Sequence, residues 1–134
     1  MTTPVLDDVS QLPLSFGALK PVGHVIVGLE DDATAERMRD ALKEEGCNDT
    51  VLQVPAKDMA QALEGWLAHA SGTSEFGTES DLMRRYQVLA EAGCGWLVVP
   101  ASDEESEQRV AEVARRFNAR FANKYGRLIV EDLL

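Results

Sequence analysis

The chain has 134 residues, 45% hydrophobic and 27% charged, a composition typical of one compact domain and unlike that of a disordered chain. Its 13 Lys and Arg against 23 Asp and Glu give a formal net charge of -10, which disfavours binding to nucleic acid or to an anionic membrane. The apolar runs are too short to span a bilayer, and Asp7 and Asp8 stand where a secretory signal needs positive charge, so we expect a cytoplasmic protein.

The beginning of the chain predicts an arm followed by a folded domain. Residues 1–22 hold three prolines and scattered apolar residues without a regular period, which predicts an extended N-terminal arm. Residues 23–134 are then expected to form a single α+β domain. Its first strand is predicted at His24 to Leu29, where β-branched residues dominate. An acidic turn leads from it into a helix over residues 33–45, which ends at Gly46.

The middle of the chain predicts a short strand and two helices. The strand covers residues 50–54 and stops at a proline. Amphipathic spacing then predicts a pair of helices between about residues 57 and 92, joined by a loop over residues 71–77.

The end of the chain predicts a strand, a helix and a strand. The apolar run at residues 96–99 is the first of these strands. Ser102-Asp103-Glu104-Glu105 has the pattern of a helix start, and the apolar face of that helix is expected to extend to Phe121. The final strand is predicted at residues 127–131.

An internal repeat predicts the fold. When the chain is shifted by about 72 positions, residues 23–27 fall on residues 95–99 and Asp31 falls on Asp103. Two strand-helix-strand units of this kind indicate a ferredoxin-like split βαβ sandwich, a four-stranded antiparallel sheet with two helices on one face. The helical pair at 57–92 would be an insertion between the halves. The alternative is a parallel, three-layer α/β sheet.

The central strands are apolar on both faces, which is the pattern of strands buried from both sides. The second face of the predicted sheet therefore needs a cover. The inserted helices and a second subunit are the two candidates, and we predict a homodimer or higher homo-oligomer that packs through this open face.

A small active site is one functional alternative. His69 lies near the end of the second helix, beside the 71–77 loop, where it would act as a base or contact a ligand. Cys94 stands between two glycines and would join such a site if a base lay next to it. We favour structural roles for both residues.

The acidic clusters at residues 30–32 and 103–105 offer oxygen ligands for a divalent cation, but carboxylates also favour helix starts. We assign them to helix starts and predict no metal. The sequence has neither a phosphate-binding loop nor a dinucleotide-binding turn, and we predict no cofactor.

The last helix contains the one basic stretch of the chain. Residues 109–127 carry six basic side chains against Glu112. Arg116 and Arg120 lie along one border of the apolar face and would receive a small anionic ligand or an acidic patch of a partner subunit. A simpler interpretation is that basic residues of this stretch form ion pairs with glutamates four positions earlier on the same helix.

Residues 23–46, which combine a Gly-His-Val-Ile-Val strand, an acidic turn and a helix ending in glycine, resemble the opening of small bacterial proteins related to general stress proteins. The resemblance covers roughly a fifth of the chain and assigns no functional residue.

We therefore predict a non-enzymatic bacterial protein that acts through homo-oligomerisation and through binding of a partner or a small ligand. The alternatives are an anion-sensing regulatory domain that uses Arg116 and Arg120, and a small enzyme built around His69 and the 71–77 loop.

Overall fold

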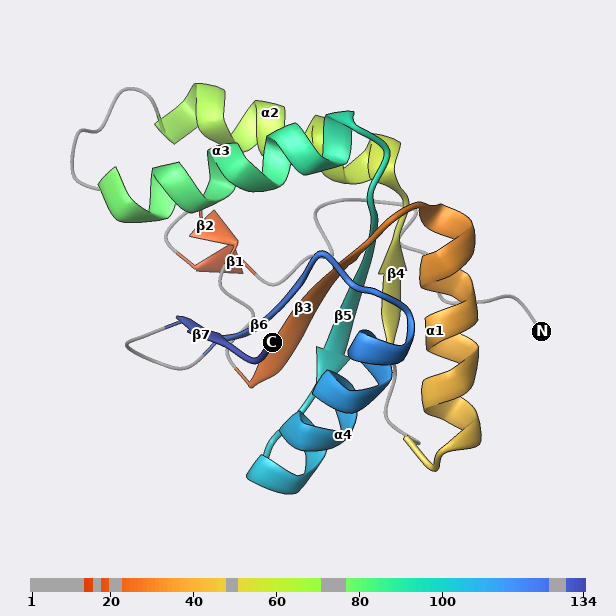
Figure 1. Cartoon of the computed structure of the whole chain (residues 1–134). Coiled ribbons are helices and arrows are strands. Elements are labelled where there is room, and N and C mark those ends of the chain that lie inside the picture. Colours follow the sequence, from red (N-terminus) through yellow and green to blue (C-terminus); the bar gives the residue numbers. More distant parts are fainter. Residues whose placement is uncertain (1–13, 16–17, 20–22, 48–50, 71–76, 126–129) are drawn as a thin grey trace.

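The structure is a computed structural model of the chain (Figure 1). It describes residues 14–15, 18–19, 23–47, 51–70, 77–125 and 130–134. The helices are α1 (Asp32–Glu44), α2 (Ala56–Ala70), α3 (Gly77–Glu91) and α4 (Glu104–Arg116). The strands are β1 (Leu14–Ser15), β2 (Ala18–Leu19), β3 (His24–Leu29), β4 (Leu52–Val54), β5 (Gly95–Pro100), β6 (Phe121–Tyr125) and β7 (Val130–Asp132). In the described ranges, none of the helices has the length and apolar character that a bilayer crossing needs.

The main sheet has five strands in the order β4-β5-β3-β6-β7, and each neighbouring pair is antiparallel. Its centre is the β3–β5 pair, which runs in register from His24 opposite Pro100 to Leu29 opposite Gly95. Strands β1 and β2 form a separate two-stranded hairpin. The predicted α+β class and antiparallel sheet are confirmed, and the parallel alternative is wrong.

The two strand-helix-strand units interleave in this sheet. Strands β3 and β4, joined by α1, lie on either side of β5, and strands β5 and β6, joined by α4, lie on either side of β3. Helices α2 and α3 follow β4 and precede β5, so they form an insertion between the two units.

The end of the chain differs from its prediction. Helix α4 does not extend to Phe121, because Asn118 adopts a left-handed φ of 55° and the chain turns there. Phe121 instead begins strand β6, which the sequence analysis missed. The predicted final strand at 127–131 corresponds to β7, which begins at Val130, so the sheet has five strands and not four.

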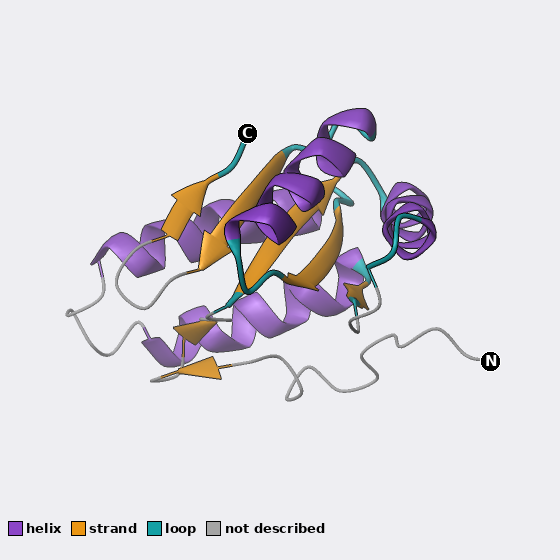
Figure 2. Cartoon of the chain, turned by 90° about the horizontal axis from the view of Figure 1, so that it is seen from below, coloured by secondary structure: helices purple, strands orange, loops and turns teal. Residues whose placement is uncertain are grey.

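Helices α1 and α4 cover one face of the sheet, and α2 and α3 cover the other (Figure 2). The buried residues separate into two clusters accordingly. The first cluster includes Val25, Val27, Leu29, Ala35, Met38, Leu42, Leu97, Val99, Val110, Val113, Ala114 and Ala122. The second includes Ile26, Val54, Met59, Leu63, Met83, Tyr86, Ala90, Cys94, Trp96, Val98 and Tyr125. Alternate residues of β3 and β5 enter different clusters, which explains why both strands are apolar throughout.

The inserted helices therefore cover the second sheet face, and they are one of the two covers that the sequence analysis considered. Apolar side chains of α2 and α3, such as Met59, Leu63 and Met83, are buried in this layer. The homodimer through that face stays a prediction, and the surface that it would use carries α2 and α3.

The acidic clusters lie at helix starts, as expected. The Asp31 carboxylate accepts a hydrogen bond of 2.7 Å from the backbone N–H of Thr34, and Asp103 accepts one of 2.7 Å from that of Ser106. Both aspartates are N-caps, of α1 and α4. Among the described residues, no group of three or more His, Cys, Asp and Glu side chains is arranged to hold a metal.

These caps predict a loss of stability in acid. Hydrogen bonds from Thr34 lower the pKa of Asp31, and hydrogen bonds from Ser106 lower the pKa of Asp103. A carboxyl whose pKa is lower in the folded state stabilises the fold above its unfolded pKa, and this contribution is lost as pH falls below about 4 through the folded value.

Asparagine also caps helices but does not titrate, so a double variant Asp31→Asn and Asp103→Asn is the matched comparison. Thermal unfolding followed between pH 7 and pH 3 should show a shallower fall of the melting temperature in this variant. Equal slopes in the two proteins would contradict the assignment of these caps.

Candidate functional site

The candidate site contains three residues that lie side by side on neighbouring strands beneath helix α3. Gly28 of β3 lies opposite Trp96 of β5 on one side and opposite Phe121 of β6 on the other. The ring of Phe121 lies over Gly28, and a Cβ atom added at Gly28 would collide with that ring. The missing side chain at Gly28 thus provides the space in which the two aromatic residues meet.

Tyr86 of α3 completes an aromatic cluster with these two residues. Its ring centroid lies 5.1 Å from Trp96, edge to face, and 5.0 Å from Phe121, nearly parallel to it. The Trp96 and Phe121 centroids are 5.4 Å apart. These distances fall in the range at which aromatic pairs attract each other beyond their burial. Tyr86 and Trp96 are fully buried, whereas Phe121 is half-buried and is the member that solvent reaches.

Trp96 carries an unsatisfied donor inside this cluster. The residue has an exposed fraction of 0%, and its indole Nε1 has no hydrogen-bond partner among the described residues. A buried donor without an acceptor costs about 1–3 kcal/mol, so such groups are rare in folded proteins. An incoming acceptor atom would remove this cost.

The other polar groups of this layer satisfy one another. The hydroxyl oxygens of Tyr86 and Tyr125 are 3.0 Å apart, and Asn123 donates through Nδ2 to the Tyr86 hydroxyl at 2.9 Å. Burial raises the pKa of Tyr86 and outweighs these two hydrogen bonds, so the phenol stays protonated at neutral pH. This network fixes α3 to β6 beside the aromatic cluster.

Cys94 and Arg120 lie at the edge of the same layer. Cys94 comes two residues before Trp96, is 4% exposed and belongs to the same buried cluster. Burial raises the pKa of its thiol, while the charge of Arg120 and its hydrogen bond to the thiol act in the opposite direction. The backbone N–H of Arg120 donates to Gly28 at 2.7 Å, which holds the start of β6 against β3.

The structure describes the side chains of two of the three predicted ligand-binding residues, Arg116 and Arg120, and these two have different partners. Arg116 forms an ion pair with Glu45 at the end of α1. Arg120 contacts Cys94 and directly precedes Phe121 of the aromatic cluster in the chain. The side chain of His69 and residues 71–76 of the predicted loop lie outside the described residues, so the enzyme alternative stays a prediction.

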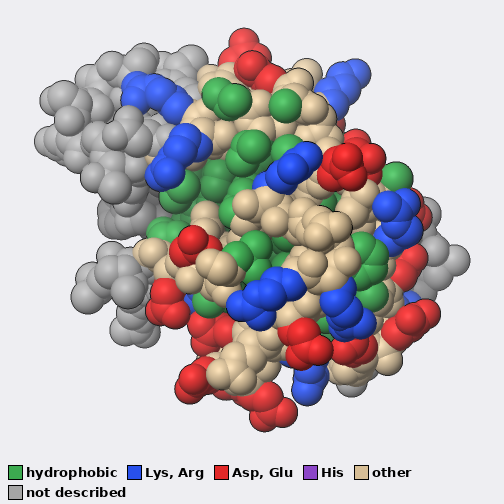
Figure 3. All heavy atoms as spheres, viewed as in Figure 1, with side chains coloured by type: hydrophobic (Ala, Val, Ile, Leu, Met, Phe, Trp, Pro, Cys, Tyr) green, Lys and Arg blue, Asp and Glu red, His purple; other side chains and the backbone are tan. Residues whose placement is uncertain are grey.

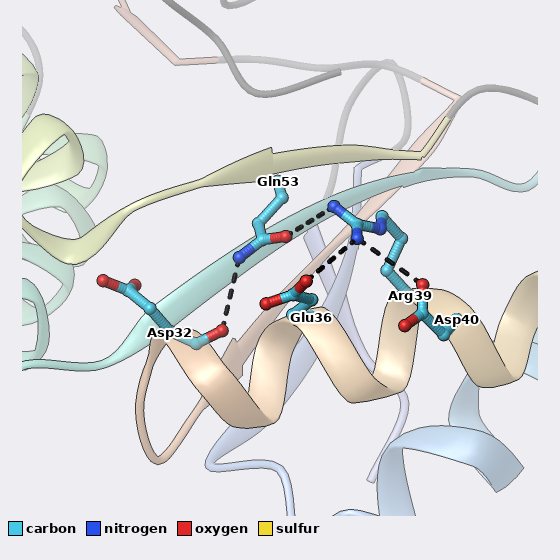
Figure 4. Close-up of polar contacts among 5 residues, drawn as sticks. All are labelled: Asp32, Glu36, Arg39, Asp40 and Gln53. Atoms are coloured by element: carbon cyan, nitrogen blue, oxygen red, sulfur yellow. Dashed lines mark hydrogen bonds and ion pairs between the residues drawn. The ribbon is translucent and has the colours of Figure 1, made fainter. Parts of the chain in front are cut away.

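Two other polar clusters have structural roles. Figure 4 shows the side chain of Gln53, on β4, joined to two residues of α1: the backbone of Asp32 and the side chain of Arg39. Gln53 accepts a hydrogen bond of 2.7 Å from Arg39 and donates one of 3.2 Å to the carbonyl of Asp32. Arg39 also contacts Glu36 and Asp40, so this cluster fastens the edge strand to α1.

A groove of about 230 Å³ lies between α4 and the C-terminal residues, with Glu104 and Glu131 in its lining. Glu107 also lines it, but its carboxylate already pairs with Lys124 at 3.5 Å. The Lys124 ammonium donates to the carbonyl of Ala101 at 2.7 Å, so this pair joins α4, β6 and the end of β5.

The sequence analysis missed the aromatic cluster because its members come from three separate elements. Phe121 was assigned to the apolar face of the last helix, whereas it begins strand β6. The register of β6 against β3 brings Phe121 to Gly28, and no local pattern shows that register. The one available signal was a glycine inside a predicted strand, which often marks a close approach of another group.

Comparison with known proteins gives no relative from which to assign the site, since no protein-family model, curated protein or solved structure matches the chain. The resemblance to bacterial stress-related proteins therefore stays a prediction.

The contact between Gly28 and Phe121 predicts a specific destabilisation. Gly28→Ala should lower the free energy of unfolding by about 1–3 kcal/mol, because its methyl group overlaps the ring. In a Phe121→Ala background the same change should cost much less, since the ring is absent. Urea unfolding of the four proteins of this cycle measures the coupling.

Gly65→Ala is the control, because a Cβ at this exposed position of α2 meets no atom within 4 Å. It should leave stability unchanged or raise it by up to about 1 kcal/mol. A Gly28→Ala cost that is equal with and without Phe121 would refute the contact.

Proposed function

We propose that this protein is a non-enzymatic binding domain that takes a small ligand between its sheet and the α2–α3 pair, next to Trp96. The observation that carries this proposal is the buried indole N–H of Trp96 without an acceptor. A ligand that brings a carbonyl or carboxylate oxygen to this atom would satisfy the donor, and its apolar part would pack against the surrounding rings.

The chemistry of the neighbouring groups supports binding in preference to catalysis. The Cys94 thiol is buried and its pKa is raised, which is the reverse of the shift that activates a nucleophilic cysteine. The Tyr86 hydroxyl already contacts Tyr125 and Asn123. What the cluster offers a ligand is one free donor and, at the ring of Phe121, an aromatic surface that solvent reaches.

The fold that we propose for this domain is a ferredoxin-like split βαβ sandwich. The strand order β4-β5-β3-β6, the antiparallel pairing and the two interleaved strand-helix-strand units support it. Helices α2 and α3 would be an insertion that covers the second sheet face, and β7 an added edge strand. In this arrangement the insertion turns an exposed sheet face into an enclosed binding layer.

A fluorescence titration with Prodan tests the proposed function, because this neutral naphthalene dye carries a carbonyl acceptor and emits at shorter wavelength in apolar surroundings. We expect saturable binding at one site with a blue-shifted emission. Trp96→Phe keeps an aromatic ring but removes the donor, and should weaken binding roughly fivefold, the value of one neutral hydrogen bond.

Trp66→Phe makes the same chemical change at the other tryptophan of the chain and should bind Prodan as the unaltered protein does. Circular dichroism checks that both variants remain folded. Binding that does not saturate, or that is unchanged by Trp96→Phe, would refute a site at Trp96.

A further inference from the structure

We propose that the ligand of this site is an organic anion with a flat apolar body, whose carboxylate or similar oxyanion lies between Arg120 and the indole N–H of Trp96. This inference rests on the proposed function and adds the chemical class of the ligand. It depends on three observations: how Arg120 differs from the other cations near it, where Arg120 lies, and which part of the cluster solvent reaches.

Arg120 differs from the neighbouring basic residues in its partner. Arg109 pairs with Glu105, Arg116 with Glu45 and Lys124 with Glu107. Arg115 donates to the backbone carbonyl of Leu133 at 3.1 Å. Within the described part of the chain, no carboxylate pairs with Arg120, and the side chain that it contacts is the neutral thiol of Cys94.

Among the residues that the structure describes, no carboxylate offsets the positive charge of Arg120. A guanidinium has five N–H donors arranged to bind both oxygens of a carboxylate. Arg120 is exposed, so solvent and a dissolved ligand can reach its side chain. In a protein with a net charge of -10, an uncompensated cation of this kind selects anions locally.

The backbone places Arg120 near the unsatisfied donor. Cys94 directly precedes β5 and lies two residues before Trp96, so their Cα atoms are at most about 7 Å apart, and both residues belong to the same buried cluster. The guanidinium that reaches Cys94 therefore lies within one ligand length of the indole. The backbone N–H of Arg120 also donates to the carbonyl of Gly28, the residue between Trp96 and Phe121, which fixes the Arg120 backbone relative to the ring cluster.

The aromatic rings are the reason why we infer a flat apolar body for the ligand. Phe121 is the half-buried member of the cluster and directly follows Arg120. Rotation of its ring away from Gly28 would uncover the backbone of β3 and the side of Trp96, and a flat ring system would take its place. Figure 3 shows apolar side chains gathered in the upper middle of the viewed face, where α3 passes the sheet in Figure 1; acidic side chains lie in the lower part and also at the top and right.

Two probes of equal shape test the ligand class: 2-naphthoate and its neutral amide, 2-naphthamide. Both carry a carbonyl oxygen for the Trp96 donor, and only the first carries a negative charge. We expect calorimetric titration to show 2-naphthoate binding about tenfold more tightly, the effect of a hydrogen bond to a charged group. Arg120→Gln should remove this preference and leave 2-naphthamide binding within about twofold.

Arg116→Gln is the matched control, because Arg116 belongs to the same basic stretch but pairs with Glu45. It should leave the affinity for both probes unchanged. If the amide binds as well as the anion, or if Arg116→Gln weakens 2-naphthoate as much as Arg120→Gln does, the anion class is wrong while the site at Trp96 stands. If neither probe binds, both the anion class and the proposed function fail.

Discussion

The burial of strands β3 and β5 on both faces is the constraint on which the rest of this structure depends. Each strand sends apolar side chains to both sides of the sheet, so each side needs a layer of helices. Helices α1 and α4 of the repeated units supply one layer, and the inserted pair α2 and α3 supplies the other (Figure 2). Polar contacts then fasten the edges, such as the bridge from Gln53 to α1. The insertion is therefore a structural requirement of this sheet, and the layer that it closes contains the candidate site.

Within that layer, the absence of a side chain at Gly28 allows the aromatic cluster to form. The register places Gly28 between Trp96 and Phe121, and the space that it leaves allows these rings to meet beneath Tyr86. Close packing of the rings buries the indole N–H of Trp96 without an acceptor. A backbone hydrogen bond from Arg120 to Gly28 holds the start of β6 in place, and the Arg120 side chain contacts Cys94. A donor, a cation and apolar rings thus come together from β3, β5, β6 and α3.

Local patterns in the sequence predicted most of this fold. Apolar strands, the caps at Asp31 and Asp103 and the helix spacing placed α1, α2, α3, α4, β3, β4 and β5, because these signals are short-range. Strand β6 was missed because its apolar residues continue the helical period of α4, and the left-handed turn at Asn118 that separates them has no strong signal. The candidate site could not be predicted from local patterns, because its residues are brought together by the register between strands. Arg120 was identified from its charge and from helical spacing with Arg116, but the difference between the two residues depends on which of them has a carboxylate partner.

The indole N–H resonance of Trp96 tests the central claim most directly, because it reports on the unsatisfied donor itself. In ¹⁵N-labelled protein carrying Trp66→Phe, a single indole signal remains, since the chain has two tryptophans. The structure predicts slow exchange of this proton with water in the free protein and a downfield shift when Prodan saturates the site. Rapid exchange in the free protein would show that the donor is already hydrated, and a resonance that ligand leaves unmoved would show that it is not the recognition group; either result would contradict the account.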